Sequence, residues 1–320
     1  MTPDDRPKLR VLVLGTGAMG SAVAGLLAHQ SRSDVTIAGR WVAALEALRE
    51  RGVLVETPEG RFASSVSALP LDEVPGRSYD AVIVLVKSTA TADVAPVAAR
   101  ARLELGLVLT LQNGLGNFEL LAAAAGEDNV VAGVAGFGAT SLGPGHVRVF
   151  PGSLAIGASP TTALRLAPLA TAFARAGMTA NISPSRDRVL WTKLAINCAI
   201  NPVAALHRKP NGQLLSIPEA RSAMLEAAAE VARVAAARGT DIGPYAEDRV
   251  LLAAERTAGN LNSMLQDVLR GVPTEIESLN GALVHEAQRL GVPVPVNEHL
   301  RDAIRAIDSS LIRAGECRPC

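Results

Sequence analysis

A glycine-rich turn between an apolar segment and a helix-like segment constrains this chain more than any other feature. Residues 9–14 form a run that is apolar except for Arg10, and Gly15, Gly17 and Gly20 then complete the pattern G-x-G-x-x-G. Residues 18–30 follow with apolar side chains at helical spacing. In such a setting the first glycine permits a tight turn, the second lets backbone N–H groups approach a pyrophosphate, and the third lets helix and strand pack closely. An ordinary glycine-rich turn is the alternative. The predicted dinucleotide-binding residues of this turn are Gly15, Thr16, Gly17, Ala18, Met19 and Gly20.

Strand and helix signals alternate along the first half of the chain. Further strands are predicted at 34–38, 81–86 and 107–111, and a helix at 41–51. This alternation is typical of a parallel, doubly wound sheet with right-handed crossovers. From residue 129 on, strands are predicted at 130–139, 146–150, 154–158 and 178–182, with a helix at 162–176. The turn at residues 143–145 predicts an antiparallel hairpin.

The stretch Ser183-Pro184-Ser185 marks the predicted domain boundary, because strand signals end there. The fold class that follows is an α/β Rossmann-type domain over residues 1–184 and an all-α domain over residues 185–320. Helices are predicted at 188–206, 217–238, 244–257, 275–290 and 297–312.

The overall composition excludes several classes of function. The 31 basic and 31 acidic residues cancel, and no basic patch indicates a nucleic acid or a membrane surface as partner. The polar start is unlike a signal peptide, and uninterrupted apolar runs such as 81–86 are too short to span a bilayer, so the cytoplasm is the expected location. The three cysteines and the scattered histidines lack zinc spacing, so no metal site is predicted. Cys317 and Cys320 have redox spacing but are interpreted as part of a tail without a role.

The end of the second predicted strand carries the signal for the type of nucleotide. An NAD site usually places an acidic residue there, for the ribose hydroxyls. This chain has Gly39-Arg40 and no carboxylate. A guanidinium can bind a 2′-phosphate, so NADP(H) is favoured over NAD(H). A solvated surface Arg40 is the alternative, and it would leave the preference undecided.

The scarcity of lysine points to the catalytic group. Only four of the 31 basic residues are lysines, namely Lys8, Lys87, Lys193 and Lys209. Where arginine is the default cation, a retained lysine can mark a place that needs a proton donor, because arginine is not deprotonated in proteins. Lys87 follows a predicted parallel strand at the sheet edge where ligands bind in α/β folds. Lys8 and Lys209 are interpreted as solvated.

Lys193 belongs to a polar stripe on a largely apolar helix. Lys193, Asn197 and Asn201 are spaced i, i+4 and i+8, so they share one helix face. Burying three polar side chains is costly unless partners are supplied, and a bound substrate could be such a partner. The alternative is that the stripe is the solvent face of the helix.

These features together resemble the ketopantoate reductase family. The resemblance covers roughly residues 9–311 and includes the glycine turn, Arg40 and Lys87. It continues with Gln112-Asn113-Gly-Leu-Gly116 and with Trp-x-Lys193-x-x-x-Asn197-x-x-x-Asn201-Pro. Its last blocks are Asn211-Gly212, Ser263-Met-Leu-Gln-Asp267 and Thr274-Glu275-Ile-Glu277-x-x-Asn280-Gly281.

The resemblance implies NADPH as cofactor, a small keto acid as substrate and a homodimer as the form that the family often takes. It implies Lys193 as the general acid and Glu275 as the carboxylate that cooperates with it near the cofactor. Asn113 resembles the residue at the nicotinamide end, and Lys87 resembles a residue that lines the cofactor site. Asp267 and Glu277 match the family pattern, but they could equally cap a helix or form a surface pair. The implied substrate-binding residues are Asn113, Lys193, Asn197, Asn201, Asn260 and Ser263.

Three functional hypotheses remain open on the sequence. The first is reduction of ketopantoate to pantoate for pantothenate biosynthesis. The second keeps the chemistry and changes the substrate to another 2-keto acid or a cyclic imine. The third is a regulatory protein that binds NADPH without turnover; it predicts loss of the lysine or the glutamate, and both Lys193 and Glu275 are present.

Overall fold

The chain folds into two compact units. The computed structural model describes residues 8–31, 33–243 and 246–313. The first unit extends to Gln112 and resumes over Asn117–Arg186, and the second comprises Asn113–Gly116 and the chain from Asp187 on. The predicted boundary after residue 184 lies two residues before this change of unit. The separate assignment of Asn113–Gly116 was not predicted. Cys317 and Cys320 lie outside the described residues.

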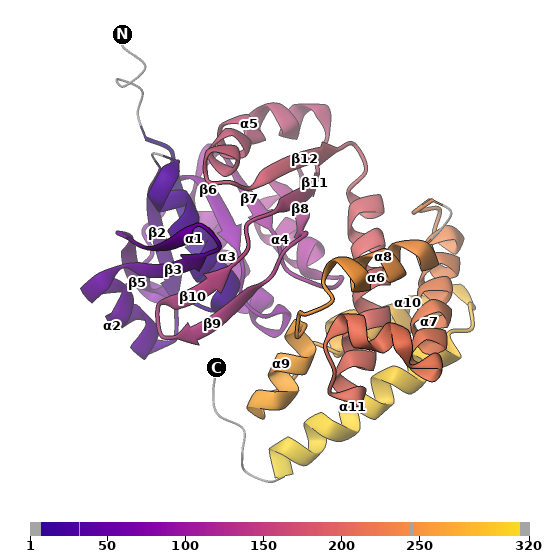
Figure 1. The fold of residues 1–320 in the computed structure, drawn as a ribbon. Coiled ribbons are helices and arrows are strands. Elements are labelled where there is room, and N and C mark those ends of the chain that lie inside the picture. Colours follow the sequence, from indigo (N-terminus) through magenta and orange to yellow (C-terminus); the bar gives the residue numbers. More distant parts are fainter. Residues whose placement is uncertain (1–7, 32, 244–245, 314–320) are drawn as a thin grey trace. The chain divides into compact units, whose positions relative to one another are not determined.

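The first unit is built on an eight-stranded sheet in the order β12-β11-β8-β7-β6-β1-β2-β5 (Figure 1). All neighbouring pairs are parallel except β8 and β11, so the predicted parallel, doubly wound sheet is confirmed with one antiparallel pairing. The strands are β1 (Arg10–Leu14), β2 (Asp34–Gly39), β5 (Ser67–Pro70), β6 (Tyr79–Val84), β7 (Arg102–Thr110), β8 (Val130–Ala135), β11 (Ser153–Gly157) and β12 (Thr179–Ser183).

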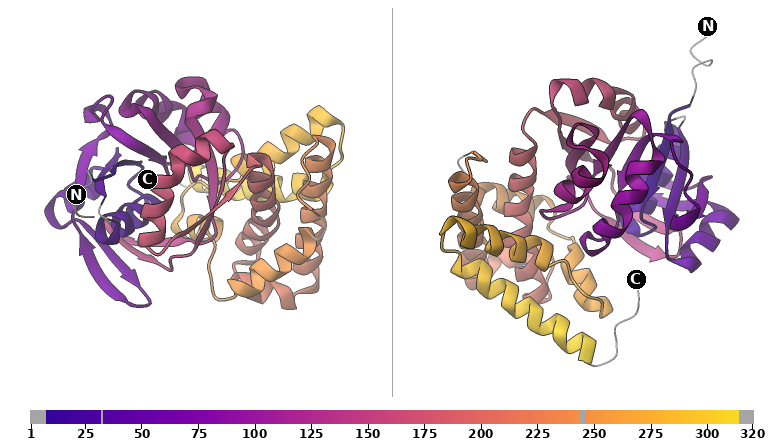
Figure 2. Two further views of the ribbon diagram at one scale, coloured as in Figure 1. Left: turned by 90° about the horizontal axis from the view of Figure 1, so that it is seen from above. Right: turned by 180° about the vertical axis from the view of Figure 1, so that it is seen from behind.

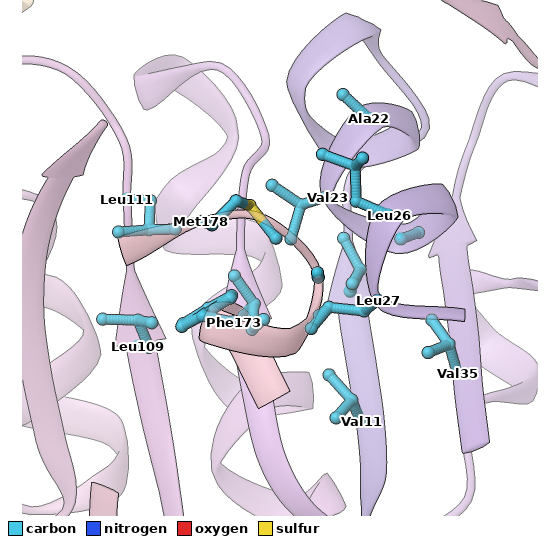
Figure 3. Close-up of a cluster of buried hydrophobic side chains, with 14 of the residues drawn as sticks. Val11, Ala22, Val23, Leu26, Leu27, Val35, Leu109, Leu111, Phe173 and Met178 are labelled. Atoms are coloured by element: carbon cyan, nitrogen blue, oxygen red, sulfur yellow. The ribbon is translucent and has the colours of Figure 1, made fainter. Parts of the chain in front are cut away.

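Five helices pack with this sheet. Figure 3 shows Val23 and Leu27 of the first helix beside Phe173 and Met178, over the strand residue Val11. All five side chains are buried. Apolar strands that are covered in this way read as continuous apolar runs, which is why the sequence revealed them. The helices are α1 (Ala18–Gln30), α2 (Val42–Arg51), α3 (Thr91–Ala101), α4 (Asn117–Ala125) and α5 (Pro160–Arg175).

A second, four-stranded sheet in the order β4-β3-β10-β9 corrects the sequence-based prediction. Its strands are β3 (Val53–Thr57), β4 (Gly60–Ser64), β9 (Ala139–Gly143) and β10 (His146–Val149). The segment predicted as one strand at 130–139 is divided between β8 and β9, which belong to different sheets. The predicted hairpin of β9 and β10 is present, but β10 also pairs in parallel with β3. Strands β3, β4 and β5 were missed because they are short and several of their side chains are polar or partly exposed.

The described part of the second unit is helical, as predicted. Figure 2 shows α11 in yellow beside other helices of this unit in both views. The predicted helix at 275–290 is instead a π-helical turn, Glu277–Gly281, followed by α10, and α9 was not predicted. The helices are α6 (Arg186–His207), α7 (Pro218–Ala237), α8 (Ala246–Arg256), α9 (Ser263–Arg270), α10 (Ala282–Leu290) and α11 (Pro295–Arg313). Short 3₁₀ segments lie at Leu71–Glu73, Ser88–Ala90, Glu127–Asn129 and Asn211–Ser216.

Helix α6 is the most apolar long helix of the described chain. Its 22 residues reach a mean hydropathy of 1.4 over 18 residues, enough by length and composition to cross a membrane, but 72% of that window is buried inside the protein. A buried core helix satisfies the same criterion. Lys193, Asn197 and Asn201 interrupt its apolar sequence, so it contains no long uninterrupted apolar run.

Candidate functional site

The glycine turn after β1 is shaped by close backbone contacts. Gly15 has φ +122°, and a Cβ there would lie 2.7 Å from the carbonyl carbon and oxygen of Leu85. A Cβ on Gly20 would lie 1.8 Å from the carbonyl oxygen of Gly15. Both positions therefore require glycine for packing within the protein. Gly17 differs, because no atom lies within 4 Å of the position that its Cβ would take.

The open space above Gly17 lies at the start of α1. Gly17 is the residue before the helix, it has no side chain that could cap the first N–H groups, and the first turn contains no acidic residue. The N–H groups of such a first turn and the positive end of the helix dipole attract anions. The turn over Gly15–Gly20 can therefore hold a pyrophosphate, as the motif predicts.

The loop that carries Lys87 lies at the neighbouring strand end. Strand β1 pairs with β2 on one side and β6 on the other, so the chain order reverses between β1 and β6. Such a reversal opens a crevice at the carboxyl edge of the sheet. The side chain of Gln112, buried at the end of β7, donates to the carbonyl of Val86 at 2.8 Å and to the Thr91 hydroxyl at 2.8 Å. These bonds hold the loop next to Lys87, which is half-buried. Sequence reasoning assigned no role to Gln112.

Arg40 begins the loop after β2, near the glycine turn. A Cβ on Gly39 would lie 2.8 Å from the Thr16 hydroxyl, so the end of β2 lies directly against that turn. The Arg40 side chain is 63% exposed, and its Nη1 lies 2.8 Å from Oδ2 of Asp93 on α3. Arg40 is therefore available to a ligand phosphate, but it is not the plain solvated arginine of the alternative interpretation.

The polar stripe of α6 is not a solvent face. Asn197 and Asn201 are each 6% exposed, and Lys193 is half-buried. Burial lowers the pKa of the Lys193 amine below the usual lysine value. Among the described residues, no side chain forms a hydrogen bond or an ion pair with Lys193, and none forms a hydrogen bond with the Asn201 amide. Neither group is among the fully buried unpaired side-chain atoms of the described chain, so their polar atoms reach solvent and can bind a polar ligand.

Asn113 is brought to this face by the short segment that belongs to the second unit. Nδ2 of Asn197 donates to Oδ1 of Asn113 at 3.2 Å. Two residues further on, the Leu115 N–H donates to the Ser278 carbonyl at 3.1 Å. Gly114 has φ +83°, and a Cβ there would lie 2.2 Å from the same carbonyl oxygen. The glycine after Asn113 is thus required for this close approach.

Glu275 lies at the start of the segment that forms the π-helical turn. Its carbonyl accepts hydrogen bonds from the N–H of Ser278 at 3.1 Å and from its hydroxyl at 3.0 Å. The preceding Thr274 hydroxyl donates to Oδ2 of Asp308 on α11 at 2.8 Å. The half-buried Glu275 is therefore anchored on both sides, and Ser278 links it to the Asn113 segment.

Asn260 lies on a separate loop, and Ser263 is the first residue of α9, which follows that loop. Both are exposed, and no hydrogen bond within the described chain joins either side chain to α6. The loop itself is anchored by Asn211 and Asn262, which are buried. Nδ2 of Asn262 donates to Oδ1 of Asn211 at 3.0 Å, and the Asn211 N–H donates to the Asn260 carbonyl at 3.1 Å. The Asn211-Gly212 block of the sequence thus has a structural task that sequence reasoning did not assign.

A proline inside α6 leaves one backbone carbonyl next to the stripe without its helical hydrogen bond. Pro202 has no N–H, so the Cys198 carbonyl, four residues before it, lacks its normal helix partner. Nδ2 of Asn280, on the π-helical turn, donates to that carbonyl at 3.1 Å. The same amide donates to Oδ1 of Asn297 at 2.9 Å. Asn280 therefore replaces a backbone donor and joins the Glu275 segment to the helix that carries Lys193.

Asn297 is held in turn by the buried carboxylate of Glu230. This carboxylate is 3% exposed and accepts from the Val296 N–H at 3.0 Å, the Asn297 N–H at 2.9 Å and Nδ2 of Asn297 at 2.7 Å. These N–H groups belong to the first turn of α11, where a negative charge is favourable. This series of hydrogen bonds, from Glu230 through Asn297 and Asn280 to the Cys198 carbonyl, connects α7, α11, the π-helical turn and α6.

The remaining predicted positions have simple environments. Glu277 forms an ion pair with Arg305 on the surface, with Nη2 at 2.7 Å from Oε2, as the surface-pair interpretation proposed. Asp267 lies in α9, and its carbonyl accepts from the N–H groups of the residues that follow the helix. Among the described residues, no group of three or more His, Cys, Asp or Glu side chains could hold a metal ion.

Substitutions at two glycines of the turn should distinguish an effect on folding from an effect on dinucleotide binding. Gly20→Ala places a Cβ against the Gly15 carbonyl, so we expect severe destabilisation or failure to fold. Gly17→Ala meets no atom and has φ −75°, so the free energy of unfolding should change by less than about 0.5 kcal/mol. The dinucleotide should nevertheless bind about tenfold more weakly. Thermal denaturation measures the stability of both variants, and a fluorescence titration measures the Kd for the dinucleotide. Unchanged dinucleotide binding by Gly17→Ala would contradict the assignment of the pyrophosphate site to this turn.

The replacement of a backbone donor by Asn280 can be tested with a double-mutant cycle. Asn280→Ala leaves the Cys198 carbonyl without a donor and should cost about 2 kcal/mol of stability. Pro202→Ala restores the backbone N–H, so in that background the same change should cost at least about 1 kcal/mol less. Asn262→Ala, a buried asparagine whose side chain bonds Asn211 and Leu265 and not α6, serves as the control and should be additive with Pro202→Ala. Additivity of Asn280→Ala with Pro202→Ala in urea denaturation would refute the coupling.

Two family models cover most of the chain. Residues 11–161 match "Ketopantoate reductase PanE/ApbA", and residues 187–308 match "Ketopantoate reductase PanE/ApbA C terminal". A 2-dehydropantoate 2-reductase of Halobacterium salinarum is 36% identical over 299 residues, which cover 93% of this chain and 98% of the relative. A 2-dehydropantoate 2-reductase of Pyrococcus horikoshii is 32% identical and covers 94% of this chain and 98% of its own length.

Solved structures show the same fold. A PanE/ApbA family ketopantoate reductase from Ralstonia eutropha JMP134 aligns with a TM-score of 0.85 at 32% identity, covering 95% of this chain and 99% of the other. A D-mandelate dehydrogenase with NADH and anilino(oxo)acetate aligns with a TM-score of 0.88 over 95% of this chain and 99% of the other, at 23% identity, and shows the fold alone. The glycine turn, the buried stripe of α6 and the agreement over nearly the full length lead to one conclusion. The chain belongs to the ketopantoate reductase family, a family of oxidoreductases.

Proposed function

We propose that this protein reduces 2-dehydropantoate (ketopantoate) to pantoate with NADPH and with Lys193 as general acid. The observation that carries the proposal is the polar face of α6, where the half-buried Lys193 amine and the Asn201 amide have no hydrogen-bond partner among the described residues. The relatives from Halobacterium salinarum and Pyrococcus horikoshii are named for this reaction, and the chain spans 98% of each. The expected setting is pantothenate biosynthesis in the cytoplasm, by a homodimer.

Lys193 is suited to the proton transfer. When a keto group is reduced, negative charge develops on its oxygen, and an ammonium close by stabilises this charge and then donates its proton. Burial lowers the pKa of the Lys193 amine, which brings it closer to the pH at which the enzyme works. Arginine could supply the charge but not the proton. Glu275 would cooperate with the lysine from its anchored position after Thr274.

Neutral amides are suited to the rest of the substrate. Asn197 and Asn201 continue the Lys193 face toward the end of α6, and Asn113 is hydrogen-bonded to Asn197. Asparagine donates hydrogen bonds to a carboxylate or a hydroxyl without adding a charge that would shift the pKa of Lys193. Asn260, on its exposed loop, and Ser263, at the start of α9, would complete the substrate site.

The first unit fits a phosphorylated dinucleotide. The space above Gly17 and the uncapped start of α1 suit the pyrophosphate, and the exposed Arg40 suits a 2′-phosphate. Lys87 would line the same edge of the sheet. Bound NADPH would supply the hydride.

A second substrate remains an alternative because the same fold serves another oxo acid. The D-mandelate dehydrogenase structure contains NADH and anilino(oxo)acetate. Another 2-keto acid would use the same amine and amides.

A substrate panel distinguishes these proposals. We expect the purified protein to oxidise NADPH with ketopantoate at a higher kcat/KM than with 2-oxobutyrate, phenylglyoxylate or a cyclic imine, because two amides and an amine match its carboxylate, hydroxyl and carbonyl. The absorbance at 340 nm reports the rate. A higher value for another compound assigns the enzyme to that substrate, and no turnover with any of them contradicts the reductase proposal.

Removal of the amine should abolish chemistry but not cofactor binding. Lys193→Ala should lower kcat by about 10²–10⁴-fold and leave the Kd for NADPH nearly unchanged. In the wild type, kcat/KM should fall as the pH rises through the lowered pKa of Lys193, because the neutral amine cannot donate the proton. The apparent pKa of this alkaline limb of the pH profile should lie below the usual pKa of lysine. An active Lys193→Ala enzyme would contradict the general-acid role.

Removal of the guanidinium should affect one nucleotide selectively. Arg40→Ala should weaken NADPH binding by about tenfold or more and NADH binding little, since only NADPH carries the 2′-phosphate. Titration of both nucleotides by fluorescence measures the two Kd values. Equal weakening of both would show that Arg40 does not bind the 2′-phosphate.

A further inference from the structure

A charge-balanced pocket surrounds Arg40 in the first unit. Its volume is about 750 Å³. It receives guanidinium groups from Arg40, Arg49 and Arg100 and carboxylates from three acidic residues, so its formal charges cancel. Its charged lining residues are Arg40, Glu46, Arg49, Asp72, Asp93 and Arg100.

Within this pocket, we propose that Asp93 is a specificity-determining residue that limits the preference for NADPH over NADH. The inference rests on the proposed function, in which Arg40 binds the 2′-phosphate. Asp93 lies in the first turn of α3, and its Oδ2 lies 2.8 Å from Nη1 of Arg40. The carboxylate thus holds the guanidinium that the phosphate needs.

The other two arginines of the pocket are already committed to the backbone. Nε of Arg49 donates to the Ala68 carbonyl at 2.9 Å, and Nη2 of Arg100 donates to the Val74 carbonyl at 3.3 Å. These bonds keep both positive charges in the pocket and leave Arg40 as the arginine that a carboxylate holds. A phosphate that binds Arg40 therefore shares the guanidinium with Asp93, whose carboxylate already occupies Nη1.

The competition acts differently on the two nucleotides. A 2′-phosphate carries negative charge, so beside Arg40 it is repelled by the Asp93 carboxylate. A free ribose 2′-hydroxyl can instead donate a hydrogen bond to a carboxylate, which is the usual task of an acidic residue at the end of the second strand. Asp93 supplies from α3 the carboxylate that the end of β2 lacks. It therefore weakens NADPH binding and supports NADH binding.

The exposure of the ion pair sets the size of the effect. The side chains of Arg40 and Asp93 are 63% and 55% exposed. Exposed pairs are weak and screened by salt, so Asp93 tunes the preference and does not block NADPH.

Asp93→Asn is the direct test, because it removes the charge and keeps the shape. We expect the Kd for NADPH to fall about fivefold, the Kd for NADH to stay the same or rise, and kcat to change little. The effect should shrink between 0.05 and 0.5 M NaCl, because salt screens exposed charges. Asp72→Asn is the matched control: it removes one carboxylate from the same pocket, and no described residue forms an ion pair with Asp72.

The outcomes separate this inference from the function on which it rests. A selective gain for NADPH in Asp93→Asn that exceeds the gain in Asp72→Asn supports the proposal. Equal gains in both variants overturn it, because they reflect the net charge of the pocket alone. No gain in Asp93→Asn, in an enzyme where Arg40→Ala weakens NADPH selectively, overturns the role of Asp93 and leaves that of Arg40 intact. If neither Arg40→Ala nor Asp93→Asn changes the ratio of the Kd values for NADPH and NADH, while ketopantoate is still reduced, the 2′-phosphate assignment and the role of Asp93 are both overturned.

Discussion

The organisation of the second unit depends on how the polar groups of α6 are satisfied. Pro202 deprives the Cys198 carbonyl of its helix partner, and Asn280 provides a donor from a distant segment. Leaving a buried carbonyl unpaired costs more than a typical hydrogen bond contributes, so this bond constrains where the π-helical turn can lie. Asn297 and Glu230 extend the same constraint to α11 and α7. The scaffold around the helix is thereby specified by polar contacts as well as by apolar packing.

Against this paired background, the stripe of Lys193 and Asn201 stands out. Protein partners satisfy the Cys198 carbonyl and the Glu230 carboxylate, whereas the described residues provide none for the Lys193 amine or the Asn201 amide. The buried side-chain atoms without a partner in the described chain are Nε of Arg102 and Oδ1 of Asn280, and the latter belongs to the network that positions the helix. The polar atoms of Lys193 and Asn201 are not among them, so they reach solvent, where the proposed function would use them for a substrate.

The first unit illustrates a different balance, between steric and electrostatic requirements. Gly15 and Gly20 are required by the protein's own backbone, whereas Gly17 leaves space that only a ligand would use. In the proposed function Arg40 would offer a charge to the same ligand, and its ion-pair partner Asp93 would oppose a second negative charge there. The affinity of the turn for a dinucleotide and the choice between two dinucleotides would then arise from separate groups of residues.

Local patterns in the sequence were sufficient for the doubly wound sheet, the helical second domain, the glycine turn and the i, i+4, i+8 stripe of α6. Each depends on residues close together in the chain, where the periodicity of buried side chains is a direct physical signal. The short strands β3 and β4, the division of 130–139 between two sheets and the π-helical turn depend on pairing with distant segments, which local patterns do not record. The partners of Asn280 and Arg40 lie 82 and 53 residues away along the chain. Only the tertiary structure decided them, because a hydrogen bond or an ion pair forms between atoms that folding brings within about 3 Å, whatever their separation in sequence.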